Sequence, residues 1–97
     1  TKHAIEVPFE VMQTAYQSLE VIQAMATIGN PNSLSDAGVG ALCARTAVYG
    51  AYLNVRINAG GLADKAFAED ILEKASQLLQ KALTKEVEIL SLVEGRI

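Results

Sequence analysis

Polar side chains gather in one short segment, residues 29–36, which reads GNPNSLSD. Gly, Asn, Pro and Ser favour turns, so the segment predicts a loop that leads into a helix. The first turn of a helix offers unpaired backbone N–H groups and attracts negative charge, which makes this loop a natural site for an anion or a polar ligand. Plain turn and capping chemistry is the alternative explanation. The candidate residues are Asn30, Asn32, Ser33, Ser35 and Asp36.

Asn54 and Asn58 lie one helical turn apart, and Asn54 stands where the predicted helix is otherwise apolar. A buried asparagine must be hydrogen-bonded, either to a neighbouring helix or to a ligand, and the sequence leaves both roles open. The opposite side of the same helix carries a polar stripe of Arg45, Tyr49, Tyr52 and Arg56. Such a stripe suits a carboxylate-bearing ligand beside aromatic rings. It also suits the one solvated edge of the helix, which is the interpretation we favour.

Residues that commonly bind metals or act as nucleophiles are scarce. His3 is the only histidine and has no partner at ligand spacing, so we interpret it as a surface residue and expect no metal site. Cys43 is the only cysteine, and its apolar segment with no base nearby predicts a small core residue. The glycines at positions 38 and 40 fall inside a predicted helix with no strand before it, which argues against a phosphate-binding loop.

Apolar residues recur at three- and four-residue steps in three segments, which predicts three helices at about residues 8–28, 36–57 and 65–94. Pro8 fits the first turn of the first helix, and Gly29 predicts a left-handed stop at its end. Residues 1–7 are also compatible with a helix, and they would then end an upstream helix that Pro8 kinks.

Capping residues and a charge pair support the other two helices. Ser33 or Ser35 is expected to cap the second helix, and Asp64 is expected to cap the third. Asp70 and Lys74 are one turn apart on the predicted outer face of the third helix, where they can pair.

The second helix is apolar around most of its circumference, which predicts a buried central helix. Apolar or small residues cover both of its sides: Val39, Leu42, Thr46, Gly50, Leu53 and Ile57 on one, and Ala44, Val48, Ala51 and Val55 on the other. The first and third helices can cover only two sides of it. The sequence therefore predicts an all-α helical bundle of three helices that is incomplete without the rest of its domain or a partner subunit.

Composition excludes several classes of protein. Half of the 97 residues are hydrophobic (51%), five are aromatic and none is Trp, which suits closely packed helices better than a β-sandwich. The net charge of −3 argues against a nucleic-acid partner. No apolar run is long enough to span a membrane, and a lone cysteine with no signal peptide predicts a reducing, cytoplasmic location. Since the chain begins at Thr1, we expect it to be processed or to be part of a longer protein.

Residues 29–58, GNPNSLSDAGVGALCARTAVYGAYLNVRIN, resemble the corresponding stretch of the formiminotetrahydrofolate cyclodeaminase and methenyltetrahydrofolate cyclohydrolase family. The following LADKAFAEDILEKASQLLQKA is similar to the last long helix of that family, and AIEVP at residues 4–8 resembles the kinked helix before it. The pattern GNPNSxSDAG, followed by a small-residue helix that ends in NVRIN, is long and ungapped. The resemblance implies that residues 1–97 are the C-terminal half of a cyclodeaminase/cyclohydrolase-like helical domain.

The resemblance also implies a reaction of histidine degradation and one-carbon metabolism. In the cyclodeaminase, N10 of 5-formiminotetrahydrofolate attacks the formimino carbon on N5 and ammonia leaves, which gives 5,10-methenyltetrahydrofolate. The substrate is thus a tetrahydrofolate derivative. Asp36, whose charge the helix dipole stabilises, becomes the candidate catalytic residue as an electrostatic group. Asn32, Asn54, Arg56 and Asn58 are the candidates to hold the pterin or the glutamate tail, with Asn30, Ser33 and Ser35 beside them.

The family's N-terminal half carries a Gly-rich turn of PGGGS type and an acidic segment with the aspartate usually assigned as catalytic. Neither is in this chain, so we expect the chain alone to be inactive and to need the missing half of the domain. The family dimerises, which implies a homodimer. Two alternatives stay open: a methenyltetrahydrofolate cyclohydrolase, which opens the methenyl ring with water, and a non-catalytic helical dimerisation module.

Overall fold

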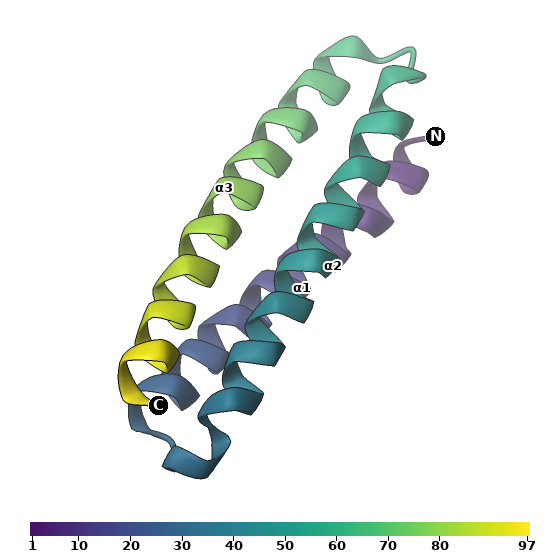
Figure 1. Cartoon of the computed structure of the whole chain (residues 1–97). Coiled ribbons are helices and arrows are strands. Elements are labelled where there is room, and N and C mark those ends of the chain that lie inside the picture. The colour runs from purple at the N-terminus through teal and green to yellow at the C-terminus, as the bar shows by residue number, and fades with distance from the viewer.

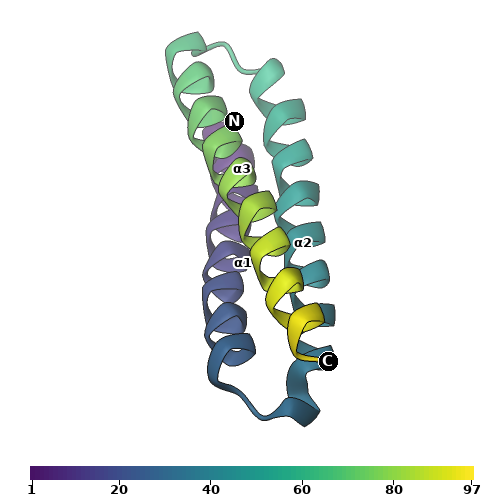
Figure 2. The ribbon, with the colours of Figure 1, turned by 60° about the vertical axis from the view of Figure 1, so that its left-hand side comes forward.

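The computed structural model describes all 97 residues, and they form three long helices that run down, up and down in Figure 1. α1 covers Lys2–Ile28, a short 3-10 turn η1 covers Pro31–Ser33, α2 covers Leu34–Gly60 and α3 covers Lys65–Arg96. The N-terminus lies near the α2–α3 connection and the C-terminus near the α1–α2 connection (Figure 2). The predicted all-α helical bundle is confirmed, and no helix combines the length and apolar character needed to cross a membrane.

α1 is one continuous helix with Pro8 inside it, so the start predicted at about residue 8 is wrong and residues 2–7 belong to the same helix. The hydroxyl of Thr1 caps it by accepting a hydrogen bond from the amide of Ala4 at 3.3 Å. Because proline has no N–H, the carbonyl oxygen of Ala4 lacks the donor that a helix normally supplies. The predicted left-handed stop at Gly29 is wrong, since its φ of −76° and ψ of 171° are extended. Glycine is needed there because a Cβ would collide with the carbonyl group of Met25.

The start of α3 agrees with the sequence prediction. Asp64 caps it by accepting a hydrogen bond from the amide of Phe67 at 3.1 Å, and it also pairs with Lys2 at 3.0 Å. The hydrogen bond from Phe67, together with Lys2, holds the pKa of the Asp64 carboxyl below its ordinary value. The predicted pair of Asp70 and Lys74 is present at 2.9 Å. α2 and α3 both run slightly beyond their predicted ends, and α3 continues through the glycine expected to stop it.

Buried residues repeat mostly at three- and four-residue steps in α2 and α3, the pattern of helices that wind gently around one another. In α1 every seventh residue is buried: Ile5, Met12, Leu19 and Ala26. The core side of α2 is mostly alanine and valine, with Ala41, Ala44, Val48, Ala51 and Val55. Small residues let the backbones approach closely, and at Gly40 an added Cβ would stand only 3.2 Å from Cδ1 of Ile22.

The bundle is thin for its length. It measures 51 × 17 × 15 Å, and its radius of gyration of 15.3 Å exceeds the roughly 12.5 Å expected for a compact domain of this length. Only 21 of the 97 residues are buried, although 51% are hydrophobic, so much of the apolar content stays outside the core. The prediction that two neighbours leave part of α2 uncovered is confirmed.

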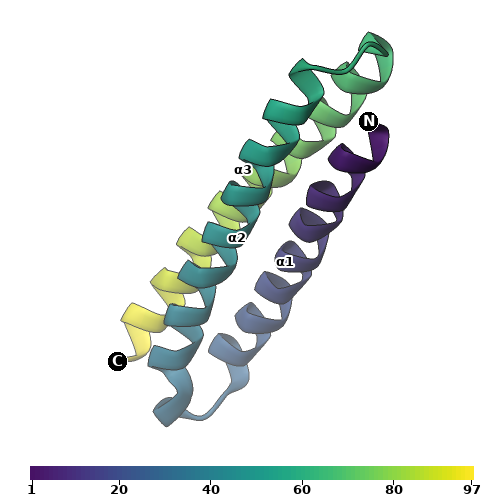
Figure 3. The same ribbon diagram turned by 90° about the vertical axis from the view of Figure 1, so that its right-hand side faces the viewer.

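Ten of the twelve exposed large hydrophobic residues belong to α1 and α2, which lie side by side in front of α3 in Figure 3. We call the exposed apolar surface of these two helices the open face; its large members include Val7, Val11, Val21 and Met25 of α1 and Val39, Leu42, Leu53 and Ile57 of α2. Small residues fill the helical steps between them. The hydroxyls of two of these, Ser18 and Thr46, donate to carbonyls of their own helices at 3.2 and 3.0 Å. These groups are satisfied internally, so another apolar surface can cover the open face without stranding them.

Candidate functional site

The loop between α1 and α2 forms a compact turn. The side-chain oxygen of Asn30 accepts a hydrogen bond from the amide of Asn32 at 2.9 Å, and its carbonyl accepts from the amide of Ser33 at 2.9 Å. Ser33 occupies the N-cap position of α2, but its side chain makes no capping bond. Ser35 and Asp36 fall inside the first turn of α2, where the helix dipole favours a carboxylate. The loop thus uses Asn30 to build its own turn and leaves the polar side chains of Asn32, Ser33, Ser35 and Asp36 exposed or half-buried.

A second candidate site is a groove between α1 and α2, at the opposite end of the bundle. Asn54 and Asn58 line it from α2, and the amide of Asn58 donates to the carbonyl of Asn54 at 2.9 Å. The groove has a volume of about 410 Å³, and its apolar wall consists of Ala4, Val7, Pro8, Val11, Ala47 and Ala51. The carbonyl oxygen of Ala4, which Pro8 deprives of its donor, adds an acceptor to this wall. The groove therefore offers a mostly apolar surface with a few polar groups, the usual composition of a small-molecule site.

Asn54 is exposed, which corrects the prediction that it is buried and needs a hydrogen-bonded partner. The error has a simple cause. Asn54 lies on the apolar side of α2 that α1 and α3 do not cover, so its side chain is free to reach a ligand or a further protein segment.

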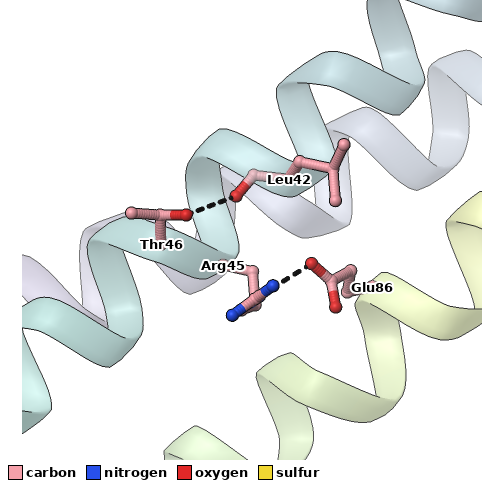
Figure 4. A network of polar contacts seen from close by, with 4 residues as sticks. All are labelled: Leu42, Arg45, Thr46 and Glu86. Carbon is pink, nitrogen blue, oxygen red and sulfur yellow. Dashed lines mark hydrogen bonds and ion pairs between the residues drawn. The ribbon is translucent and has the colours of Figure 1, made fainter.

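The polar stripe of α2 makes contacts across helices and is only partly a solvated edge. Nε of Arg45 donates to the carboxylate of Glu86 on α3 at 2.8 Å (Figure 4), and Glu86 is only 9% exposed. The rings of Tyr49 and Tyr52 meet edge to face with centroids 6.1 Å apart. The guanidinium of Arg56 lies 5.9 Å from the centroid of Tyr52. The stripe is therefore held by its own neighbours, and Arg45 in particular ties α2 to α3.

The predicted site residues fall into three separate groups. Asn54 and Asn58 share the groove, whereas Arg56 points to another side of α2, toward Tyr52. Asp36 and the loop lie about 27 Å from Asn54 along α2, at roughly 1.5 Å of rise per residue. One copy of this chain therefore does not bring all the predicted residues around one small ligand.

The two residues most often linked to metal or thiol chemistry lie on the surface. His3 is exposed, as predicted. Cys43 is also exposed, so the prediction of a small core residue is wrong. Cys43 stands on the side of α2 next to the open face, where no second element covers it. No group of three or more His, Cys, Asp or Glu residues is arranged to hold a metal ion.

Two residues that shape the molecule escaped the sequence analysis. Glu86 occupies a position in the buried stripe of α3, between Ala82 and Ile89, and a charge at such a position is a signal that could have revealed the pair with Arg45. Arg96 donates to the carbonyl oxygens of Ala26 and Thr27 at the end of α1. This contact ties the end of α3 to the start of the loop, and no sequence pattern predicts it.

The fold and the groove define a helical-bundle protein with a candidate ligand site between two helices. A family model described as formiminotransferase-cyclodeaminase matches residues 1–77. The chain belongs to this family.

Relatives match nearly the whole chain. It is 37% identical over 95 residues to a formimidoyltransferase-cyclodeaminase of Rattus norvegicus, a match that covers 98% of this chain and 18% of that protein. It is 35% identical over 96 residues to a methenyltetrahydrofolate cyclohydrolase of Methylorubrum extorquens, covering 99% of this chain and 46% of that protein. A formimidoyltransferase-cyclodeaminase of Dictyostelium discoideum is 36% identical over 93 residues, covering 93% of this chain and 17% of that protein. The chain thus spans less than half the length of each of these relatives.

Proposed function

We propose that this chain is the C-terminal half of a helical domain that converts 5-formiminotetrahydrofolate into 5,10-methenyltetrahydrofolate with release of ammonia. The observation that carries the proposal is the match of residues 1–77 to the formiminotransferase-cyclodeaminase family, extended by relatives along 98% of the chain. The name of the rat relative points to this reaction. A cytoplasmic location agrees with a lone, exposed cysteine.

The open face supports the proposal that more protein covers α1 and α2 in the working enzyme. Ile57 is 78% exposed and Val39 is 60% exposed, and large apolar patches of this kind mark interaction surfaces. Apart from Val7 and Val11, which line the groove at Asn54 and Asn58, we assign this surface to the N-terminal half of the domain and to a second copy of the chain in a homodimer. We expect both partners to supply helices, because apolar stripes at helical spacing suit helix-on-helix packing.

The groove at Asn54 and Asn58 is the part of this chain best suited to hold the folate ring system. Its apolar wall can pack against a flat ring, while the two side-chain amides and the carbonyl of Ala4 can bind ring nitrogens and oxygens. The volume of about 410 Å³ is enough for part of a drug-sized ligand. Arg56 and the loop residues Asn30, Asn32, Ser33 and Ser35 would contact other parts of the substrate, such as its glutamate tail, once a partner completes the site.

The reaction sets the requirements for the remaining groups. N10 forms a bond to the formimino carbon, its proton leaves to a base, and the C–N bond to the amine breaks as an acid protonates the leaving ammonia. The product carries a cationic carbon between N5 and N10, which nearby negative charge stabilises. Asp36 of a second copy of the chain is our candidate for that charge, because no ion pair within the chain neutralises it and because Asp36 of the same copy lies about 27 Å from the groove along α2.

A methenyltetrahydrofolate cyclohydrolase is the second candidate function, and the relative from Methylorubrum extorquens favours it. Its substrate is the product of the first reaction, so the same groove and the same charge would serve both. The two functions differ in the nucleophile, which is N10 in one case and water in the other. Incubation of the longer protein with each substrate separates them, because only the cyclohydrolase consumes methenyltetrahydrofolate.

Asp36→Asn in the longer protein tests the proposal. The change keeps most hydrogen bonding and should lower the free energy of unfolding by only about 0.3–1 kcal/mol. Loss of an electrostatic stabiliser should reduce the formation of methenyltetrahydrofolate about 100-fold or more, followed by absorbance. Asp70→Asn is the matched control, because Asp70 pairs with Lys74 on the outer surface of α3. Turnover within a few-fold of the unaltered protein would show that the loop is structural, and no turnover of either folate by that unaltered protein would favour the non-catalytic module.

A further inference from the structure

A second groove lies between α1 and α3, on a different side of α1 from the groove at Asn54 and Asn58. It has a volume of about 300 Å³, the lower end of the range for small-ligand pockets. Its lining is almost entirely polar: Tyr16 from α1 and Gln80, Lys81, Thr84, Lys85 and Glu88 from α3. The folate proposal uses none of these residues.

Two lysines of this groove, Lys81 and Lys85, form no ion pair within the chain. Lys81 and Lys85 stand one turn apart on α3, where like charges repel each other. The ion pairs of the chain join Lys2 to Asp64, Arg45 to Glu86 and Lys74 to Asp70, and so involve neither of these lysines. Glu88 is the one carboxylate of the lining, so the groove keeps an excess of positive charge that a bound anion would balance.

Gln23 of α1 holds one side of the groove in place. Its side-chain oxygen accepts a hydrogen bond from Nζ of Lys85 at 2.7 Å, and its side-chain nitrogen donates to the carboxylate of Glu88 at 3.2 Å. An ammonium group has three donors, so Lys85 keeps two for a ligand. Glu88 is turned toward Gln23, and its charge disfavours a second negative group at that end of the groove.

Further donors surround the two lysines. Nζ of Lys81 and the hydroxyls of Tyr16 and Thr84 form no hydrogen bond within the protein, although all three residues line the groove. Lys81 also lines the adjoining hollow of about 400 Å³ between Phe9 and Leu78, so it stands at the junction of two hollows. The groove thus combines free charged donors, free hydroxyl donors and one lysine already oriented by a hydrogen bond.

We propose that the α1–α3 groove binds a small oxyanion, held between Lys81 and Lys85 with the hydroxyls of Tyr16 and Thr84 as further donors. Phosphate groups and carboxylates share this chemistry. The net charge of the lining, two lysines against one glutamate, favours a ligand with one anionic group.

Titration of the ¹⁵N-labelled chain with inorganic phosphate, and separately with acetate, tests the proposal by NMR. Sodium chloride keeps the ionic strength constant, so general screening of charge does not change. We expect saturable shifts of amide signals centred on residues 80–88 and Tyr16. Tighter binding of phosphate would assign the groove to phosphate groups, and tighter binding of acetate would assign it to carboxylates; both results support an oxyanion site.

Lys81→Met removes one charge and keeps the length of the side chain. It should weaken binding about tenfold, the effect of losing one charge-assisted hydrogen bond. Lys65→Met makes the same chemical change in α3 outside the groove and should leave binding within about twofold, as expected for a distant surface charge. Tyr16→Phe should weaken binding a few-fold through loss of one hydroxyl donor. Shifts that do not saturate, or that respond equally to Lys81→Met and Lys65→Met, would overturn the proposal.

Discussion

The two long sides of α2 are both apolar, yet only one of them is covered. The side toward α1 and α3 carries small residues such as Ala41, Ala44 and Val48, and these are buried. The other side carries larger residues, including Leu53 and Ile57, and these stay exposed. Hydrophobicity alone therefore predicts that both sides of α2 are buried, and it does not identify the segment that covers each side.

Polar contacts divide the two sides in the same way. On the covered side they cross to a neighbouring helix, as in the pair of Arg45 and Glu86. On the open face, the hydroxyls of Ser18 and Thr46 bond only to their own helices. The covered side of α2 packs against α1 and α3. The open face has the apolar composition of an interface, but no other segment of the chain packs against it.

A carboxylate placed on the covered side of α2 should lower stability far more than a carboxylate placed on the open face. Val48 is fully buried, so Val48→Asp would bury an unpaired carboxylate and cost more than about 4 kcal/mol of unfolding free energy. Ile57→Asp, on the open face, should change the stability of the dilute chain by no more than about 0.5 kcal/mol. Far-UV circular dichroism during urea unfolding measures both.

The same two variants should differ in association. The unaltered chain is expected to form a dimer or larger species at micromolar concentration, and Ile57→Asp should shift it to monomer in sedimentation equilibrium. A stable monomer of the unaltered chain with cooperative unfolding would contradict the role assigned to the open face.

Arg45→Met tests the polar link on the covered side. It leaves the carboxylate of Glu86, 9% exposed, without its partner and should cost about 1–3 kcal/mol, less than for a fully buried pair. Lys74→Met breaks the exposed pair with Asp70 and should cost no more than about 0.5 kcal/mol. Equal midpoints of chemical unfolding for the two variants would show that the link to α3 contributes nothing beyond a surface pair.

Replacing a glycine by alanine on either side of α2 should give the smallest changes in the free energy of unfolding. At Gly50, on the open face, an added Cβ meets nothing within 4 Å, and at Gly38 it would meet Cγ1 of Val93 at an ordinary 3.5 Å. In the isolated chain both changes to alanine should raise the free energy of unfolding by about 0.5–1 kcal/mol. In the longer protein the gain at Gly38 should persist, while the gain at Gly50 should shrink because a packed helix needs the space. Equal gains in both proteins would argue that nothing packs closely at Gly50.

The positions of the helices followed from the sequence because their physical signals are local. Apolar steps of three and four residues, the turn-forming loop and the cap at Asp64 each act within a few residues. Pro8 misled the prediction because α1 continues through it, whereas proline is common in the first turn of a helix. The end of α1 at Gly29 depends on a close approach to Met25, which composition does not reveal.

The surroundings of single residues on α2 were harder to predict. Because α2 is apolar nearly all round, its periodicity does not tell which sides α1 and α3 occupy. Cys43 and Asn54 were therefore expected in the core and are exposed. Arg45 was expected at a solvated edge and instead contacts Glu86, a residue 41 positions away in the sequence. Asp36 and Asn54 lie near opposite ends of α2. The distance between these two parts of the candidate site therefore depends on the full length of the helix.

Cys43 offers the most direct measurement of whether the open face is covered. It is the only cysteine of this chain, and its thiol is exposed beside the open face. We expect iodoacetamide to modify it rapidly in the dilute isolated chain and at least about tenfold more slowly in the longer protein, because a covered thiol reacts only when the interface opens. Mass spectrometry of the peptide that contains Cys43 gives both rates. Equal rates in the two proteins would contradict the account, since the open face would then remain exposed in the longer protein.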